Sequence, residues 1–219
     1  MQVNEIRALV KITAVSSALA SLLVLYALVT ELVSYKGQAI SGHISLLGYE
    51  LEILGTEVRV PPLDSVRKVS LVVGVIAFLN LASVTAGLYR LARRREFEAV
   101  EFLASSALIS ALALTLLYSL LRVVANDVLP ALPTLGSFTT LAGILKLEKP
   151  IEEKSLVFVV YEKAGFLLFL WAIFSLVLAF VLVYVLLKSS EAESQANSLA
   201  SLTPMILVRM QELESEKVR

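Results

Sequence analysis

The chain has 219 residues, of which 58% are hydrophobic and 17% charged, and its mean hydropathy is +0.82. This composition excludes an ordinary soluble domain and predicts an integral membrane protein. Nineteen Lys and Arg balance nineteen Asp and Glu, so the charge balance does not indicate a nucleic-acid partner. Because the chain has no cysteine and one histidine, it excludes disulfides, thiolate metal sites and iron–sulfur clusters. We therefore expect no metal, no cofactor and no enzyme activity.

Four uncharged apolar stretches are long enough to cross a hydrocarbon core, which takes about 20 residues. Arg7 and Lys11 precede the first stretch, but its apolar run exceeds the roughly 7–15 residues of a signal-peptide core. We therefore expect a retained span. The four spans are predicted at residues 12–30, 69–89, 102–121 and 164–187.

The orientation of the spans is predicted from the short connection at residues 90–101. It carries a run of basic residues, Arg93, Arg94 and Arg95, and such runs favour the cytoplasmic side. We expect a multi-pass protein of the cell membrane with both termini in the cytoplasm. The four spans and a β-rich first outer loop resemble the general topology of claudins. The chain lacks the paired cysteines and first-loop tryptophan of that family, since its one tryptophan is Trp171, and we assign no family.

An internal repeat is indicated at a shift of 92–95 residues. Residues 17–20 match residues 110–113, and residues 42–48 resemble residues 136–142. The predicted fold is an all-α transmembrane four-helix bundle made by tandem duplication of a helix-loop-helix hairpin. The expected divisions are a first hairpin at 1–99, a second at 100–188 and a cytoplasmic tail at 189–219.

The two outer loops, residues 31–68 and 122–163, are long enough to carry structure of their own. Apolar and charged residues alternate at 49–53 and 57–60, which is typical of a half-buried hairpin. Residues 145–148 and 155–161 are also predicted as strands, and Glu152 and Glu153 as part of a charged turn between them. We expect a small extracellular β-sheet, built from both loops and seated on the helix ends.

Small and polar residues within the spans predict close helix packing. Ser17 and Ser21 in span one, and Ser106 and Ser110 in span three, are spaced by four, so these helices are expected to pack at the centre. A polar path along this centre is the alternative to a packed core. Asn80 is the one strongly polar side chain at mid-depth, and we interpret it as hydrogen-bonded to a neighbouring helix rather than to a substrate.

Charged and aromatic residues near the span ends suggest further contacts. Glu31 and Arg122 end spans one and three, where they form an ion pair or reach the headgroups separately. His43 is expected to be an ordinary loop residue. Span four is expected to face lipid or a partner subunit because it is bulky and aromatic, with Phe166, Phe169, Trp171, Phe174 and Phe180.

The tail after Lys188 is expected to form a separate amphipathic helix that opens at Thr203-Pro204. Its apolar residues recur at helical spacing and form a candidate partner-docking stripe. The alternative is that this helix packs against the chain's own bundle. The stripe consists of Leu199, Leu202, Ile206, Met210 and Leu213.

Three classes of function follow from these features. The first is a structural or accessory tetraspan subunit that acts through its outer β-sheet and tail. The second is a homo-oligomeric channel or small-solute transporter subunit. The third, a membrane enzyme or electron carrier, lacks the ligands and nucleophiles it would need. The expected partners are the lipid bilayer and other membrane proteins or a second copy of the chain, without nucleic acid.

Overall fold

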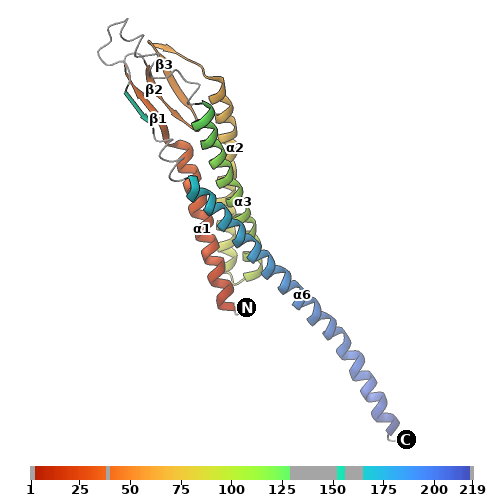
Figure 1. Cartoon of the computed structure of the whole chain (residues 1–219). Coiled ribbons are helices and arrows are strands. Elements are labelled where there is room, and N and C mark those ends of the chain that lie inside the picture. Colours follow the sequence, from red (N-terminus) through yellow and green to blue (C-terminus); the bar gives the residue numbers. More distant parts are fainter. Residues whose placement is uncertain (1–2, 38–39, 129–151, 156–164, 218–219) are drawn as a thin grey trace.

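The computed structural model describes residues 3–37, 40–128, 152–155 and 165–217, and the side chains of residues 5–37, 41–127 and 165–191. Among these residues, four long helices carry a small antiparallel sheet at one end (Figure 1). We call this end the sheet end, and the opposite end, where residues 93–95 join two helices, the arginine end. The helices are α1 (Val3–Val29), α2 (Pro61–Ala92), α3 (Glu96–Val123) and α6 (Gly165–Lys217).

All four helices contain a segment long and apolar enough to cross a membrane. This confirms the four predicted spans in length and composition, and it suggests a membrane protein. Helices suit such sequences because their backbone hydrogen bonds are satisfied within the segment, without water. The segments are Glu5–Val29, Pro61–Ala92, Glu96–Asp127 and Gly165–Glu191, with hydropathies of 2.2, 2.2, 2.0 and 2.9.

Helix α3 is the central element, since it contacts α1, α2 and α6. The predicted contact between spans one and three is therefore present, but α2 and α6 share the same central helix. On α2 the buried positions alternate in steps of three and four, the 3.5-residue period of left-handed helix packing. They are Leu63, Val66, Ser70, Val73, Ala77, Asn80, Val84 and Gly87.

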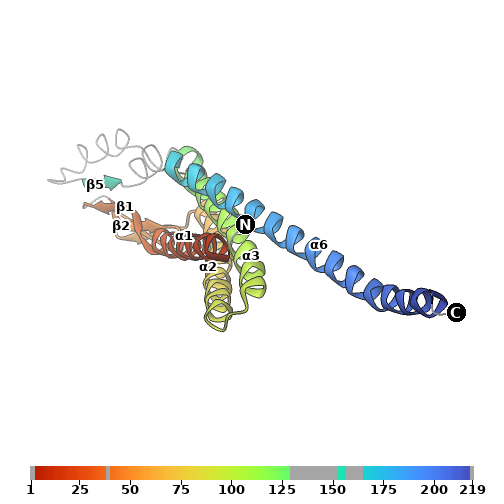
Figure 2. The ribbon, with the colours of Figure 1, turned by 90° about the horizontal axis from the view of Figure 1, so that it is seen from below.

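Helix α6 packs on α3 along one seam and then continues beyond the arginine end (Figures 1 and 2). The view from below shows it crossing α3 and running away from α1 and α2. The break expected at Thr203-Pro204 is absent, because α6 is one helix of 53 residues. Residues 189–201 are rich in Ala, Glu, Gln and Ser and contain no glycine or proline that would end a helix. The seam residues, all buried, are Leu168, Ala172, Ser175, Leu178, Ala179, Leu182 and Val185.

The sheet is antiparallel, with strand order β4-β3-β2-β1-β5. Strand β5 comes from the segment between α3 and α6 and pairs with β1, so that Val33 lies opposite Ser155. The sheet is therefore built from both connecting segments, as predicted, although its extracellular position stays a prediction. The strands are β1 (Glu31–Lys36), β2 (Ile40–Ser45), β3 (Tyr49–Ile53), β4 (Thr56–Glu57) and β5 (Glu152–Ser155).

The individual strands follow the sequence prediction only in part. The hairpin of β3 and β4 turns at Leu54 and Gly55, whose φ angles of 52° and 76° fit a tight two-residue turn. Strands β1 and β2 were not predicted, and Glu152 and Glu153 lie in β5 instead of a turn. The strand predicted at residues 145–148, and most of that at 155–161, lie outside the described residues.

The sheet is seated directly on the helix ends. One face of β1, β2 and β3 buries Val33, Ile44 and Leu51 in the same apolar cluster as Leu28 of α1 and Leu121 of α3. Burial of this face supplies the apolar cover that a small sheet needs for stability. The sheet and the helices therefore share one core, which fixes the position of the sheet relative to the bundle.

Candidate functional site

The most buried polar site lies where α1, α2 and α3 meet. The side chain of Asn80 is fully buried, and its Nδ2 donates to Ser21 Oγ of α1 at 2.8 Å and to Ser110 Oγ of α3 at 2.7 Å. Ser106 Oγ of α3 donates to Asn80 Oδ1 at 2.7 Å. One amide thus links three helices through three hydrogen bonds, and we call these four residues the Asn80 cluster.

The Asn80 cluster is closed to solvent. Ser21 is 1% exposed, and Asn80, Ser106 and Ser110 are 0% exposed. Ser110 Oγ donates onward to the Ser106 carbonyl oxygen at 2.9 Å. None of these side chains titrates at ordinary pH. The cluster can fix the register of three helices, but its hydroxyls are engaged in these hydrogen bonds and it contains no ionisable side chain. Ser17, also predicted to lie at a helix contact, is 1% exposed on the same face of α1.

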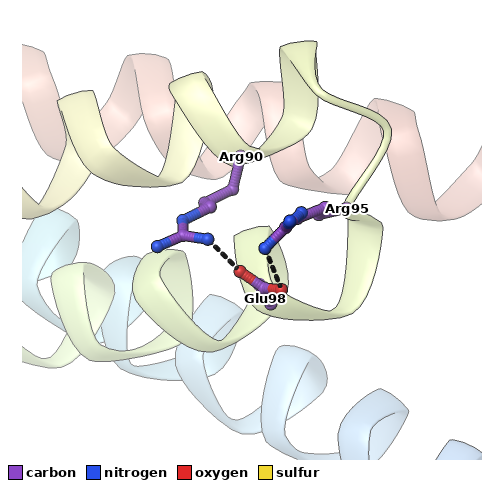
Figure 3. Close-up of polar contacts among 3 residues, drawn as sticks. All are labelled: Arg90, Arg95 and Glu98. Carbon is purple, nitrogen blue, oxygen red and sulfur yellow. Dashed lines mark hydrogen bonds and ion pairs between the residues drawn. The ribbon is translucent and has the colours of Figure 1, made fainter.

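The arginine end is held by ion pairs between helices (Figure 3). Glu98 of α3 accepts from Arg90 of α2 at 2.6 Å and from Arg95 at 3.1 Å. Arg7 of α1 contacts Glu96 of α3 at 2.6 Å. These pairs are partly exposed, so each contributes on the order of 1 kcal/mol or less. Their placement joins α1 and α2 to the first turn of α3.

The three arginines predicted to set the orientation differ in their surroundings. Arg95 is paired with Glu98, whereas the Arg93 guanidinium lies 4.6 Å from the centre of the Tyr89 ring. Arg94 takes a left-handed backbone conformation, with φ of 60°, within the tight turn between α2 and α3. The side of the membrane on which this turn lies stays a prediction.

Glu31 and Arg122 are not joined by an ion pair in the structure, although both residues are described. Glu31 is the first residue of β1 and lies opposite Ser45, so its direction follows the sheet instead of the α1 axis. Arg122 remains on the last turn of α3. Both residues are exposed, which favours the alternative in which each reaches the surface separately.

A polar pocket of about 370 Å³ lies between the sheet and the start of α2. Tyr49 Oη accepts from the Val60 N–H at 2.9 Å and donates to Asp64 Oδ1 at 3.2 Å, which fixes β3 against α2. His43 lines this pocket from β2, opposite Glu50, instead of lying in a loop as predicted. Within the described residues, no group of three His, Asp or Glu side chains could hold a metal ion.

Helix α6 combines its seam with an exposed aromatic surface. Phe166 is 67% exposed, Phe180 64% and Tyr184 63%. Trp171 is half-buried, and its indole N–H donates to Ser16 Oγ of α1 at 2.9 Å. Phe169 and Phe174 are also exposed. The contacts of α6 with the rest of the chain thus leave most of its aromatic residues uncovered.

The predicted docking stripe lies in the part of α6 beyond residue 191. The backbone of Leu199, Leu202, Ile206, Met210 and Leu213 is helical, and their side chains lie outside the described set. The stripe therefore stays a prediction.

Sequence reasoning missed three contacts that position the helices and the sheet. Arg7–Glu96, Trp171–Ser16 and Tyr49–Asp64 join residues 89, 155 and 15 positions apart. No local spacing pattern connects such partners. The available signal was a polar group on a side chain in or next to an apolar segment. Such a group needs a hydrogen-bond partner, but the sequence does not identify that partner.

Comparison with known proteins does not assign the chain to a family. No family model matches it, and no match was found among curated proteins or solved structures.

Proposed function

We propose that this chain is a multi-pass membrane protein that acts as an accessory or scaffold subunit and holds other membrane proteins through α6 and the sheet. The observation that carries the proposal is α6 itself. This helix packs on α3 by one seam and continues far beyond the arginine end (Figure 1). A helix that extends so far from its own bundle is suited to contact a neighbour.

The exposed surface of α6 supports this proposal. Large aromatic residues anchor interfaces because they bury much area and lose little conformational freedom. Phe166, Phe180 and Tyr184 are each more than half exposed on α6. Lipid can cover these rings, and a partner helix that packs beside α6 would bury the same rings within the membrane.

The interior of the bundle supports an accessory role over a channel within one chain. A path for polar solutes needs polar groups that are free to replace water. In the Asn80 cluster, the amide and hydroxyl groups bond to one another. The buried hydroxyls of Ser70 and Ser175 have no partner among the described residues, but two separate hydroxyls do not form a continuous polar lining.

The proposed orientation places the arginine end in the cytoplasm and the sheet outside the cell. It follows from the dense basic turn at residues 93–95, because Lys and Arg in short loops favour the cytoplasmic side. A cysteine introduced at Gly55, in the turn between β3 and β4, tests the orientation. It is expected to react with a membrane-impermeant maleimide on intact cells, whereas a cysteine at Arg94 is not.

Native purification tests the proposed function. The full chain is isolated from its source membrane in mild detergent, and every co-purifying protein is weighed and identified. We expect stoichiometric recovery of at least one other membrane protein. A homo-oligomer without foreign subunits would contradict the accessory role, and flux measurements in liposomes would then test the channel alternative.

A change in the distal part of α6 locates the contact. The double variant Leu202→Asp with Ile206→Asp alters the predicted stripe and is expected to lose the partner. The control, Ser201→Asp with Gln211→Asp, adds the same charge at two positions outside the stripe spacing and is expected to keep it. Equal retention by both variants would exclude the stripe as the docking surface.

A further inference from the structure

A groove of about 480 Å³ lies between α2 and α3 near the sheet end. Its walls are Val66 and Val69 of α2 and Leu116 and Leu120 of α3. Val69 is 45% exposed and Val123, also on the wall, is 40% exposed. The groove therefore opens on the outer surface of the bundle, away from the Asn80 cluster.

The groove changes from apolar to polar along its length. Val69 and Leu116 lie within uncharged stretches that end at Lys68 and Arg122. Ser65 and Asp127 line the groove on the other side of those charges. In a membrane, the first part would lie among acyl chains and the second at the level of the headgroups. A membrane lipid has the same polarity along its own length.

The backbone next to the groove is unusual. Residues Val124–Val128 form a short π-helix directly after α3, and Val123 and Asp127 both line the groove. Single π-helical turns are rare and occur frequently at functional sites. Here the wider turn lies where Asp127 reaches the polar end of the groove.

We propose that this groove binds one phospholipid that carries a primary amine, with an acyl chain between α2 and α3 and its ammonium group at Asp127. An apolar groove gives water almost no hydrogen-bond partners, so a lipid chain is the occupant that the bilayer supplies. The exposed Asp127 carboxylate is the one ionisable side chain among the described groove residues. Its charge favours an ammonium headgroup and opposes an anionic one. This lipid site is separate from the surfaces of the proposed accessory role.

Groove-filling variants test the position of the acyl chain. The full chain is purified in mild detergent, incubated with phosphatidylethanolamine and weighed by native mass spectrometry. The wild type is expected to retain one lipid. Val69→Trp and Val123→Trp, which fill the groove from its two walls, are each expected to lose it. Val75→Trp makes the same change on α2 at an exposed position outside the groove and is expected to retain it. Equal retention by the groove variants and Val75→Trp would overturn the site.

Headgroup selectivity tests the contribution of Asp127. Phosphatidylethanolamine, phosphatidylcholine and phosphatidylglycerol with identical acyl chains are compared. The wild type is expected to prefer the ethanolamine lipid by about threefold to fivefold, as for an exposed ion pair. Asp127→Asn is expected to bind all three about equally. Preference for the glycerol lipid would contradict the proposal. It would also be contradicted if the wild type were recovered with a second copy of the chain instead of lipid and the groove variants lost that copy.

Discussion

Two buried polar side chains show how differently the helices are held. Asn80 of α2 makes three side-chain hydrogen bonds to α1 and α3. Ser175 of α6 is 1% exposed on the seam with α3, and its hydroxyl has no hydrogen-bond partner. The Asn80 cluster therefore joins the three inner helices by directional bonds, whereas α6 is held on α3 mainly by buried apolar residues.

This difference indicates which helices can move relative to one another. Hydrogen bonds between helices fix one register, because a shift of one turn leaves the buried amide unpaired. A mostly apolar seam tolerates tilting or sliding at a smaller cost, since the directional bond described above between α6 and another helix is that from Trp171 to Ser16 of α1. We expect α1, α2 and α3 to behave as one unit, and α6 to be the helix that adjusts to a partner.

The largest expected effect is at Asn80. Asn80→Ala removes three hydrogen bonds and should lower the free energy of unfolding by about 2 kcal/mol, at about 0.6 kcal/mol per bond in membranes. Reversible unfolding in mixed micelles with increasing dodecyl sulfate measures this loss. Ser83→Ala on the same helix, where the hydroxyl is exposed and bonds to the Phe102 carbonyl oxygen, is the control. Similar losses for both variants would remove the distinction between the cluster and ordinary helix contacts.

The next effect concerns the close approach of α2 and α3 near the arginine end. A Cβ atom added at Gly87 would lie 2.8 Å from Leu103 Cγ, which is too close for two carbon atoms. Gly87→Ala is expected to cost about 1–2 kcal/mol through overpacking. Gly74→Ala is the matched control, because its Cβ would meet a Leu28 methyl group at 3.3 Å, which needs only a small shift. Thermal unfolding of both variants under the same conditions compares them.

The seam of α6 should respond in the opposite direction. Ser175→Ala removes a buried hydroxyl that has no partner and is expected to raise the free energy of unfolding by about 0.5–1 kcal/mol. The corresponding change in the Asn80 cluster, Ser110→Ala, is expected to lower it. A loss of stability in Ser175→Ala would mean that α6 is held by a polar contact after all.

The smallest effect is expected at the contact between α6 and α1. Ser16→Ala removes the acceptor of the Trp171 indole N–H and should cost about 0.5 kcal/mol. Because Trp171 is the only tryptophan, its fluorescence reports the change directly. A shift in the emission maximum with only a small decrease in the unfolding midpoint is expected. A large drop in the midpoint would show that this contact holds α6 in place.

The helices could be predicted from the sequence because a membrane span requires a long uncharged apolar segment. A segment such as residues 69–89 is not expected in a soluble domain. Strand β3 could be predicted because charged and apolar residues alternate in it. Strand β2 contains Ser41 and Gly42, which have low strand propensity, and was therefore missed. Gly42 is needed there, since a Cβ atom would lie 1.9 Å from the Glu50 carbonyl oxygen.

The candidate sites could be predicted only where one residue stands out from its surroundings. Asn80 is conspicuous as an amide in an apolar run, and Ser21, Ser106 and Ser110 follow from small-residue spacing. The groove beside Asp127 could not be predicted, because it depends on how α2 and α3 diverge and on a π-helical turn. The path of α6 also depends on its packing against α3, which the hydrophobicity of its sequence does not specify.

The pairing of β1 with β5 has a consequence for synthesis of the protein. Val33 pairs with Ser155, so the partner strand leaves the ribosome 122 residues later. Until then β1 has one open edge, which exposes unpaired backbone groups to other chains. Because β5 lies between α3 and α6, this edge closes only after the third helix has been made. The sheet is therefore completed late in synthesis. We expect that an incomplete chain is recognised by cellular quality control through the open edge of β1 and degraded.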